Sequence, residues 1–496
     1  MSVARLTEAA RNRSVSAPAT SERAYQRTMR RAGLLAACLS LVACGTLQAP
    51  PADERAAAAL QAPAAWQAPL PHNGQRTELA RWWAQFQDPL LSQLVEAAQD
   101  AGPSIASASA RIAQARAARA GAQASMGPTL NAVGSASRGQ PDISAPVGSN
   151  LSAGLQAQWE IDLFGGLRAT RDAADERLRG AAASWHEARV SVAAEVATQY
   201  TSLRACEAQL VQTRLDAQSR SETARLTDAA ARAGFQAPAN AALTRASAAQ
   251  ANGQLTQQRA QCDLAIKGLV AMTGLPEPEL RQRLASGTAS LPQPAGIVVD
   301  AVPAHVLAQR PDVEAAAREV LATGAEITQT RSQRLPRITL GGNIGLARFS
   351  GGTGNTEGST WSIGPVSVTL PLYDGGGQSA RLLAAQARQA EARTLYAARL
   401  RTAVREVEEA LVQLQSTAAR SDDVRVATEG FTASFTATEA RFKGGLASLF
   451  ELEDARRSAV QANSARIELQ RERIASWIAL YRALGGGWDT DAAPTP

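Results

Sequence analysis

The sequence predicts an α+β protein that is built twice from the same order of elements. Residues 128–134 read PTLNAVG and residues 336–342 read PRITLGG, while RAGFQA at residues 232–237 is answered by KGGLAS at residues 443–448. Each half is expected to hold a helix, two short alternating strands, a Gly-rich corner, a very long helix, a Gly turn and a returning helix. The copies lie much further apart than the ~20–50 residues of a solenoid repeat. The pattern therefore indicates an internal duplication.

The first segment is a processing signal. Residues 29–31 (MRR) are basic, and residues 32–43 are apolar but too short to span a bilayer. Residues 41–45 read LVACG, which resembles the bacterial lipobox, whose Cys is diacylated and becomes the first residue of the mature protein. We therefore expect lipidation of Cys44, and Gly45 rather than Asp after it is compatible with export to the outer membrane. A Cys placed by chance in an ordinary signal is the alternative.

The positive charge of the chain belongs mainly to this signal. The whole chain carries a formal charge of +6. Residues 1–43 hold seven Arg and two Glu, a net charge of +5, so about +1 remains for the mature protein. The high pI is therefore no argument for a nucleic-acid partner.

The Cys usage predicts a cross-link. Of the four Cys, Cys38 leaves with the signal and Cys44 takes lipid, so Cys206 and Cys262 remain. Gly234, at the expected helix turn, is the midpoint between them, and residues equidistant from the turn of an antiparallel hairpin face each other. Because an exported protein matures in an oxidising compartment, we predict a Cys206–Cys262 disulfide. Two buried free thiols are the alternative.

After a tether rich in Ala, Pro and Gln, the body of the protein begins near Trp82-Trp83. Apolar positions at helical spacing predict one or two helices over residues 90–124, with a break at Gly102-Pro103. Residues 151–162 (LSAGLQAQWEID) then alternate apolar and polar side chains, which is the period of a strand with one apolar and one polar face. Three weaker strands are expected at residues 129–137, 338–347 and 361–370.

These strands predict a membrane barrel shared between chains. We expect Trp159, Trp361 and Tyr373 at strand ends, where membrane barrels carry their aromatic girdles. Four strands cannot close a membrane barrel, since the smallest have about eight, so several chains would have to contribute to one barrel. A soluble sandwich with the same alternation is the alternative.

Two very long helices are expected after the Gly-rich corners at residues 165–166 and 375–377. Neither residues 168–232 nor residues 378–443 contain Pro, and helices of this length need partners, which the returning segments would supply. Packed coiled coils that form a tunnel wall and a solvated stalk are both compatible with the pattern. Between the halves, six Pro in residues 273–311 exclude a long helix and predict an irregular connector.

No group of residues predicts catalysis, a metal site or a cofactor. The chain has three His, widely separated, and no Cys/His cluster has metal-ligand spacing. The run GGNIG at residues 341–345 lacks the Lys of a phosphate-binding loop and its βαβ setting. An enzyme is expected to show at least one convergent constellation, so we expect no enzymatic activity.

Four motifs resemble a known family, the TolC-like outer-membrane factors, and in particular the NodT-type outer-membrane lipoproteins of resistance–nodulation–division efflux systems. The motifs are WEIDLFG at 159–165, QRPDV at 309–313, LPLYDGG at 370–376 and ALGGGW at 483–488. They occur in the family's order, and the likeness covers most of the chain from Trp82 onward. The resemblance implies a homotrimer in the outer membrane, in which each protomer gives four strands to a shared barrel and the long helical hairpins form a periplasmic tunnel.

The resemblance also implies functional residues at the two hairpin tips. The family's tips meet a periplasmic adaptor (membrane fusion) protein, and the matching residues here are Gly234, Phe235, Gln236 and Ala237 in the first half and Gly445, Leu446, Ala447 and Ser448 in the second. The first tip departs from the usual small-residue pattern at Pro238 and Asn240. Family members close the periplasmic end with charged side chains, which implies a pore gate at Glu439 and Arg441, each pairing with a neighbouring protomer. An ordinary surface pair is the alternative.

The resulting expectation is an exit duct that exports small molecules or drugs together with an adaptor and an inner-membrane resistance–nodulation–division transporter. A type I protein-secretion duct and a lipid-anchored periplasmic coiled-coil scaffold are the alternatives, and a cell-envelope hydrolase is disfavoured. We expect the following segments: 1–43 extension and signal peptide; 44–81 lipidated tether; 82–273 first repeat; 274–312 Pro-rich connector; 313–488 second repeat; 489–496 tail.

Overall fold

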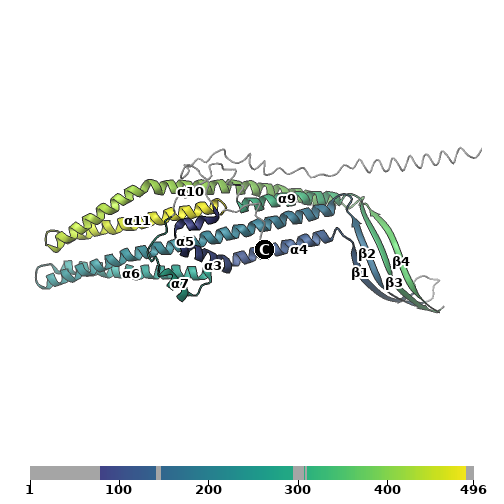
Figure 1. Ribbon diagram of the computed structural model, residues 1–496, viewed down its shortest axis with the longest axis horizontal. Helices are drawn as coiled ribbons and strands as arrows, with labels where there is room; N and C mark the ends of the chain where they lie inside the picture. The colour runs from purple at the N-terminus through teal and green to yellow at the C-terminus, as the bar shows by residue number, and fades with distance from the viewer. Residues whose placement is uncertain (1–78, 141–146, 294–306, 308–309, 353, 487–496) are drawn as a thin grey trace, which may run out of the picture. The chain divides into compact units, whose positions relative to one another are not determined.

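The computed structural model describes residues 79–140, 147–293, 307, 310–352 and 354–486. Cys44, the signal, most of the tether and the tail lie outside the described residues. The described elements are mostly helical, with one sheet (Figure 1). In chain order they are η2 (Leu79–Phe86), α3 (Pro89–Ala101), α4 (Pro103–Ala124), β1 (Thr129–Gly139), β2 (Gly148–Ile161), α5 (Gly166–Arg232), α6 (Pro238–Thr273), α7 (Glu277–Leu284), α9 (Pro311–Ser332), β3 (Arg337–Gly351), β4 (Gly354–Thr369), α10 (Gly377–Lys443) and α11 (Leu449–Ala483).

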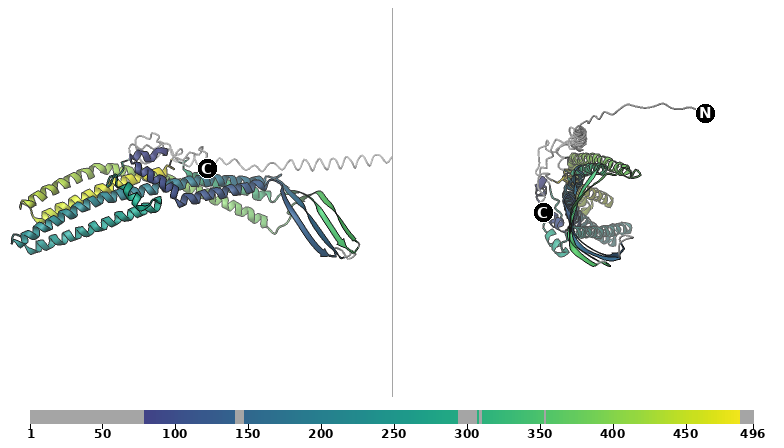
Figure 2. Two further views of the ribbon diagram at one scale, coloured as in Figure 1. Left: turned by 60° about the horizontal axis from the view of Figure 1, so that its bottom comes forward. Right: turned by 90° about the vertical axis from the view of Figure 1, so that its right-hand side faces the viewer.

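The two long helices, α5 and α10, have 67 residues each, and both span the predicted ranges. Each begins behind a Gly in the left-handed region, Gly165 at φ 76° and Gly376 at φ 91°, a conformation that side chains other than Gly rarely adopt. At 1.5 Å per residue each helix extends over roughly 100 Å. The returning helix α6 packs along α5, and α11 packs along α10 (Figure 2). The hairpins predicted from the Gly turns are confirmed.

The four strands form one antiparallel sheet in the order β1-β2-β3-β4. Chain connections place α4, α5, α9 and α10 directly at the ends of these strands, and these helices pack side by side in the same order. The strands extend beyond the predicted ranges. The prediction missed their outer halves because these are rich in Gly, Ser and Thr, which give no clear alternation of apolar and polar side chains. The expected position of Trp361 at a strand end is wrong, since it lies in the middle of β4.

The main core lies where η2, α3 and α7 pack on the long hairpins. Its fully buried side chains include Trp82, Leu91, Leu203, Leu269 and Leu480. Because this core joins residues from the first segment of the body to the last helix, it ties both hairpins to one centre. Large apolar side chains are concentrated in this core. Elsewhere, the helices contact each other mainly through Ala.

The connector between the halves is less irregular than the sequence predicts. Residues 277–284 form the short helix α7, with Pro278 in its first turn. Pro is tolerated there because the first backbone N–H groups of a helix have no partner within it. Leu280 and Leu284 are buried, so this helix contributes to the core.

No helix of the described residues is both long enough and apolar enough to cross a membrane.

Candidate functional site

The two faces of the sheet differ in chemistry. Leu155 is paired with Ile344, which in turn is paired with Trp361, and these three side chains are 44%, 62% and 72% exposed. One residue along, on the other face, Gln156 is paired with Asn343. The sheet therefore presents an uncovered apolar face on one side and an amide- and hydroxyl-rich face on the other, which is the alternation of a membrane barrel strand.

The polar face of the sheet is hollowed where strands meet helices. A hollow of about 670 Å³ is lined there by residues that include Gln156, Gln158, Arg337 and Arg381. A second hollow, of about 680 Å³, lies among α4, α5, α9 and α10, with Arg111 and Arg388 in its wall. The same helices that continue the strands thus continue a concave wall away from the sheet.

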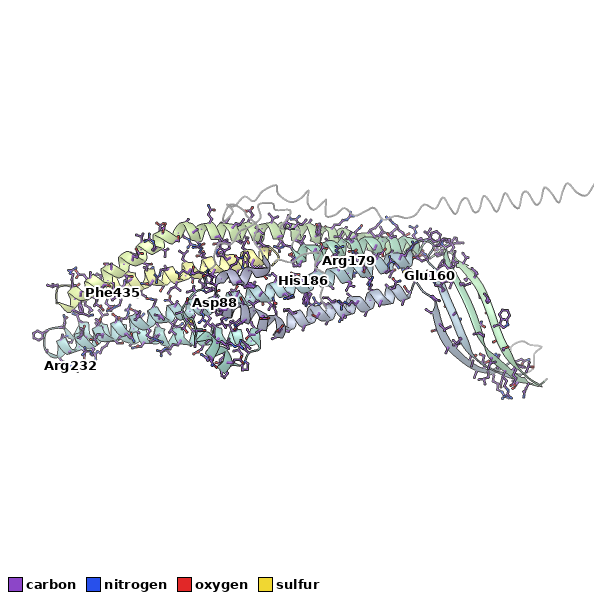
Figure 3. All side chains as sticks on the ribbon, viewed as in Figure 1. Asp88, Glu160, Arg179, His186, Arg232 and Phe435 are labelled. Carbon is purple, nitrogen blue, oxygen red and sulfur yellow. A yellow bond between two sulfur atoms is a disulfide. The ribbon has the colours of Figure 1, made fainter. Side chains whose placement is uncertain are left out.

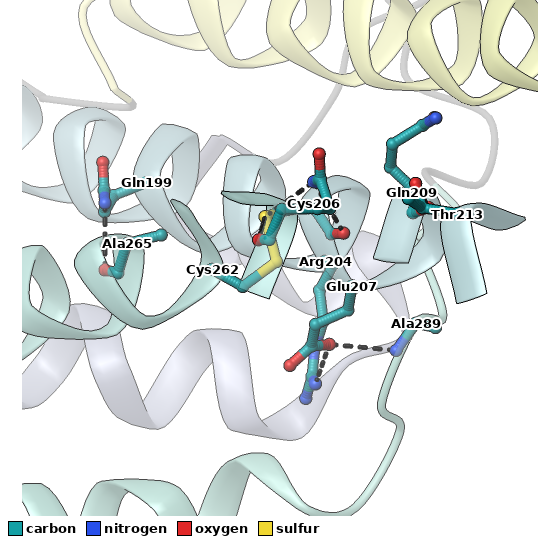
Figure 4. The surroundings of a disulfide bond; sticks show 10 residues. Gln199, Arg204, Cys206, Glu207, Gln209, Thr213, Cys262, Ala265 and Ala289 are labelled. Atoms are coloured by element: carbon teal, nitrogen blue, oxygen red, sulfur yellow. Dashed lines mark hydrogen bonds and ion pairs between the residues drawn. A yellow bond between two sulfur atoms is a disulfide. The ribbon is translucent and has the colours of Figure 1, made fainter. Parts of the chain in front are cut away.

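A disulfide joins the two helices of the first hairpin (Figure 4). Cys206 on α5 and Cys262 on α6 have their Cα atoms 5.6 Å apart, and they are the pair expected from their equal distance to Gly234. Beside it, the carboxylate of Glu207 accepts hydrogen bonds from the guanidinium of Arg204 and from the backbone N–H of Ala289, both at 2.9 Å. The first hairpin is therefore cross-linked at the level of the connector that leaves it.

Both hairpin tips use the same backbone turn. Gly234 and Gly445 take positive φ values of 82° and 73°. The backbone N–H of Phe235 donates to the carbonyl of Ala230, and that of Leu446 donates to the carbonyl of Arg441, both at 2.8 Å. This Schellman pattern satisfies the last carbonyls of a helix and needs the left-handed residue that Gly supplies.

The side chains at the tips differ. Ser448 caps α11 in a reciprocal capping box with Glu451, whereas α6 starts behind Ala237, which has no side-chain cap. Phe235 is 83% exposed and Leu446 is 74% exposed. Phe450, which the sequence analysis missed, is 80% exposed. Its position in the first turn of α11, two residues after the capping Ser448, was the signal that could have identified it.

The residues of the expected gate lie at the second tip but do not contact each other. The carboxylate of Glu439 is 3.2 Å from Lys443 Nζ and accepts a hydrogen bond from Ser219 Oγ at 3.2 Å. The guanidinium of Arg441 donates to the carbonyl of Leu446 at 3.0 Å. Within the chain, Glu439 therefore links α10 to α5, and Arg441 braces the turn.

A buried polar network joins the second hairpin to the first, and the sequence analysis missed it. Arg456 on α11 is 1% exposed. Its guanidinium donates to Thr223 Oγ1 at 2.8 Å and Ser219 Oγ at 3.1 Å on α5, and also contacts Glu453. It lies over the ring of Phe435, a residue of α10 whose position Figure 3 labels. Burial lowers the pKa of Arg456, and the carboxylate of Glu453 partly offsets this effect.

Comparisons with known proteins give a consistent result. A family model described as outer membrane efflux protein matches residues 94–275 and 302–486. The pyoverdine export outer membrane protein OpmQ of Pseudomonas putida is 29% identical, with 92% of this chain and 98% of the relative covered. The outer membrane protein OprJ of Pseudomonas aeruginosa is 28% identical, with coverages of 89% and 91%. Nodulation protein T of Rhizobium leguminosarum bv. trifolii is also 28% identical, with coverages of 84% and 90%.

Solved structures share the fold. The outer-membrane channel OprN superimposes with a TM-score of 0.78 at 26% identity, with 89% of this chain and 98% of that chain covered. The outer membrane protein VceC from Vibrio cholerae gives a TM-score of 0.71 at 25% identity, with coverages of 83% and 99%. The arrangement of long helices and four strands is therefore that of outer-membrane channels, with a helical tunnel and a β-barrel domain.

Proposed function

Because the chain belongs to the outer membrane efflux protein family, we propose that three copies of it build a single duct, with four strands from each copy in a shared barrel. The chain is the outer-membrane exit channel of an efflux pump. It extends from the outer membrane into the periplasm. We assign it no catalytic step: the duct provides a path, and the pump supplies the energy.

The main support for the trimer is that the four-stranded sheet has an exposed apolar face and, in the part of the chain that the structure describes, unpaired edges. Its apolar face is exposed, with Ile363 89% and Leu346 67% accessible, and β1 and β4 each have one edge without a partner strand among the described residues. An uncovered apolar face and unpaired strand edges are both unfavourable. Lipid on the apolar face and neighbouring copies on the edges remove both problems.

The tips support contact with a periplasmic adaptor protein. Three large apolar side chains are highly exposed there: Phe235, Leu446 and Phe450. We propose that the tip residues 234–237 and 445–448 meet the adaptor, which connects the duct to an inner-membrane resistance–nodulation–division transporter. Cys44, outside the described residues, would hold the N-terminal end of the tether to outer-membrane lipid. Cys44→Ala should abolish acylation, and acylation that persists in this variant would contradict the anchor.

The gate proposal concerns Glu439 and Arg441. Both lie within two turns of the second tip, where Glu439 contacts Lys443 and Ser219 and Arg441 donates to the carbonyl of Leu446. In a trimer, contacts of these groups with a neighbouring protomer would narrow the periplasmic end. Exposed ion pairs contribute only ~0–1 kcal/mol each, so three such pairs could hold the end closed and still open when an adaptor binds.

We propose that the exported cargo consists of small molecules. Relatives carry names that refer to pyoverdine, toluene and solvent efflux, which supports drug-sized cargo over the alternative of a type I protein-secretion duct. The other alternative, a lipid-anchored coiled-coil scaffold, would keep the sheet in water.

Two adjacent residues of β3 offer a matched test of the membrane barrel. Ile344 lies on the apolar face and Asn343 on the polar face. A charge at the lipid face costs roughly 2–4 kcal/mol near the bilayer centre, whereas lumen positions tolerate it. Ile344→Arg should abolish the trimer that migrates as one species on unheated gels, and Asn343→Arg should retain it. Equal behaviour of the two variants would favour the scaffold.

A further inference from the structure

The concave face of the outer-membrane half carries an excess of guanidinium groups. The two hollows described above open on the same side, as their shared helices show. On α9, Gln329 lines one hollow, and Gln333, the residue that caps the C-terminal end of this helix one turn later, lines the other. On α10, Arg388 and Arg381 are two turns apart and line one hollow each. The hollows are therefore two parts of one continuous surface, and its membrane end is the polar face of the sheet.

The charges on this surface do not cancel. Its five lining arginines are Arg111, Arg177, Arg337, Arg381 and Arg388. Ion pairs join three of them to carboxylates: Arg177 to Glu319 and Glu326, Arg388 to Glu326, and Arg337 to Glu160.

Those three carboxylates leave two positive charges uncompensated in each chain. Arg111 and Arg381, both exposed, have no ion pair within the part of the chain that the structure describes. Each can therefore act on a solute that passes along this surface.

The hollow further from the sheet, among α5, α10 and α11, has no such excess. Glu406, Glu409 and Glu472 in its wall are each bound by an arginine, at 2.7–2.8 Å. The remaining Glu195 faces the same hollow as Arg482, which has the opposite charge. The positive excess is thus confined to the half of the surface that adjoins the sheet.

We propose that the outer-membrane half of the duct favours anionic solutes, with small organic carboxylates as the chemical class. This rests on the proposed function, since three copies arranged around one lumen bring their uncompensated Arg111 and Arg381 side chains to a common wall. A narrow path lined by one sign of charge and walled by protein raises the local concentration of the opposite ion. Cations entering the same path are repelled, so the wall selects by charge.

Ion selectivity in planar bilayers tests the proposal. The lipidated mature protein is placed between two KCl solutions of different concentration, and the reversal potential reports which ion carries more current. Chloride should carry more than potassium, and potassium acetate in place of KCl should still give anion current. Arg111→Gln/Arg381→Gln should shift the reversal potential toward potassium, and the shift should shrink at 1 M salt, where screening acts over about 3 Å.

The matched control removes the same charge from the opposite sides of the same helices. Arg116 on α4 and Arg401 on α10 are exposed and line neither hollow, so Arg116→Gln/Arg401→Gln should leave the reversal potential unchanged. Equal shifts in both double variants, or open channels that prefer potassium, would overturn the anion preference and leave the duct intact. Inserted protein that does not conduct even as Glu439→Gln/Arg441→Gln, where the proposed gate is neutralised, would instead overturn the proposed function.

Discussion

The two helical hairpins, α5–α6 and α10–α11, share a backbone plan and differ in what holds each of them together. Their long helices have equal length, and their tips use the same Schellman turn. The first hairpin has a covalent link between its helices at Cys206 and Cys262. The second contains no Cys, and its helix α11 is held against α5 by the buried guanidinium of Arg456.

The two copies therefore share a backbone geometry, and from their different contacts we infer different mechanical roles. A cross-linked hairpin resists separation of its helices. A hairpin docked by hydrogen bonds can be released when those bonds exchange for others. We therefore expect the second hairpin, which also carries Glu439 and Arg441, to be the part that moves when the periplasmic end opens.

The largest effect is expected from removing the cross-link. Cys206→Ser/Cys262→Ser should lower the free energy of unfolding of the first hairpin by about 2–4 kcal/mol, because the loop between the Cys is no longer closed in the unfolded chain. Hydrogen exchange with and without reductant measures it. Protection should fall in α5 and α6 and stay unchanged in the distal half of α10. An equal loss in both hairpins would contradict the separate roles.

Release of the second hairpin should have the next largest effect. Arg456→Met keeps side-chain volume but leaves the hydroxyls of Ser219 and Thr223 without their charged donor, at a cost of about 2 kcal/mol. The rate of amide hydrogen exchange should rise in the part of α11 near the tip. Arg457→Met is the control, because its side chain is 71% exposed. Similar exchange in the two variants would show that the network does not hold the hairpin.

One variant can remove the helix cap at the second tip, and another can add a cap at the first tip. Ser448→Ala removes the capping box of α11 and should destabilise its first turn by about 1 kcal/mol. Ala237→Ser offers α6 the oxygen acceptor that it lacks and should stabilise its first turn by a smaller amount. Exchange rates at residues 238–242 and 449–453 measure both changes. Opposite signs are expected, and a change of the same sign in both variants would refute the assigned caps.

The sequence was informative where one periodicity or one residue type decides the structure. The alternation in residues 151–162 predicted β2, and the absence of Pro between Gly165 and Gly234 predicted a single long helix. The position of Gly234 midway between two Cys predicted which thiols meet. Each of these inferences rests on local backbone geometry, which the nearby sequence determines.

The sequence was uninformative where the decisive contact lies far along the chain. Arg456 is one of many arginines on polar helices, and nothing near it shows that Ser219 and Thr223, more than two hundred residues away, will bury it. The prediction of the outer halves of the strands failed for another reason. These segments are rich in Gly, Ser and Thr, which a strand can hold but which give little alternation of apolar and polar residues. The charge excess around Arg111 and Arg381 likewise needs the fold to bring α4 and α10 to one surface.

The most direct test of the account is single-channel conductance of the purified mature protein in planar bilayers, with wild type measured beside Glu439→Gln/Arg441→Gln. The account predicts discrete openings in both proteins and larger ones in the double variant, because neutralising the second tip removes the contacts that narrow the periplasmic end. Equal conductance in the two proteins would place the gate elsewhere. Protein that has demonstrably inserted and never conducts would contradict the duct itself and favour the lipid-anchored scaffold.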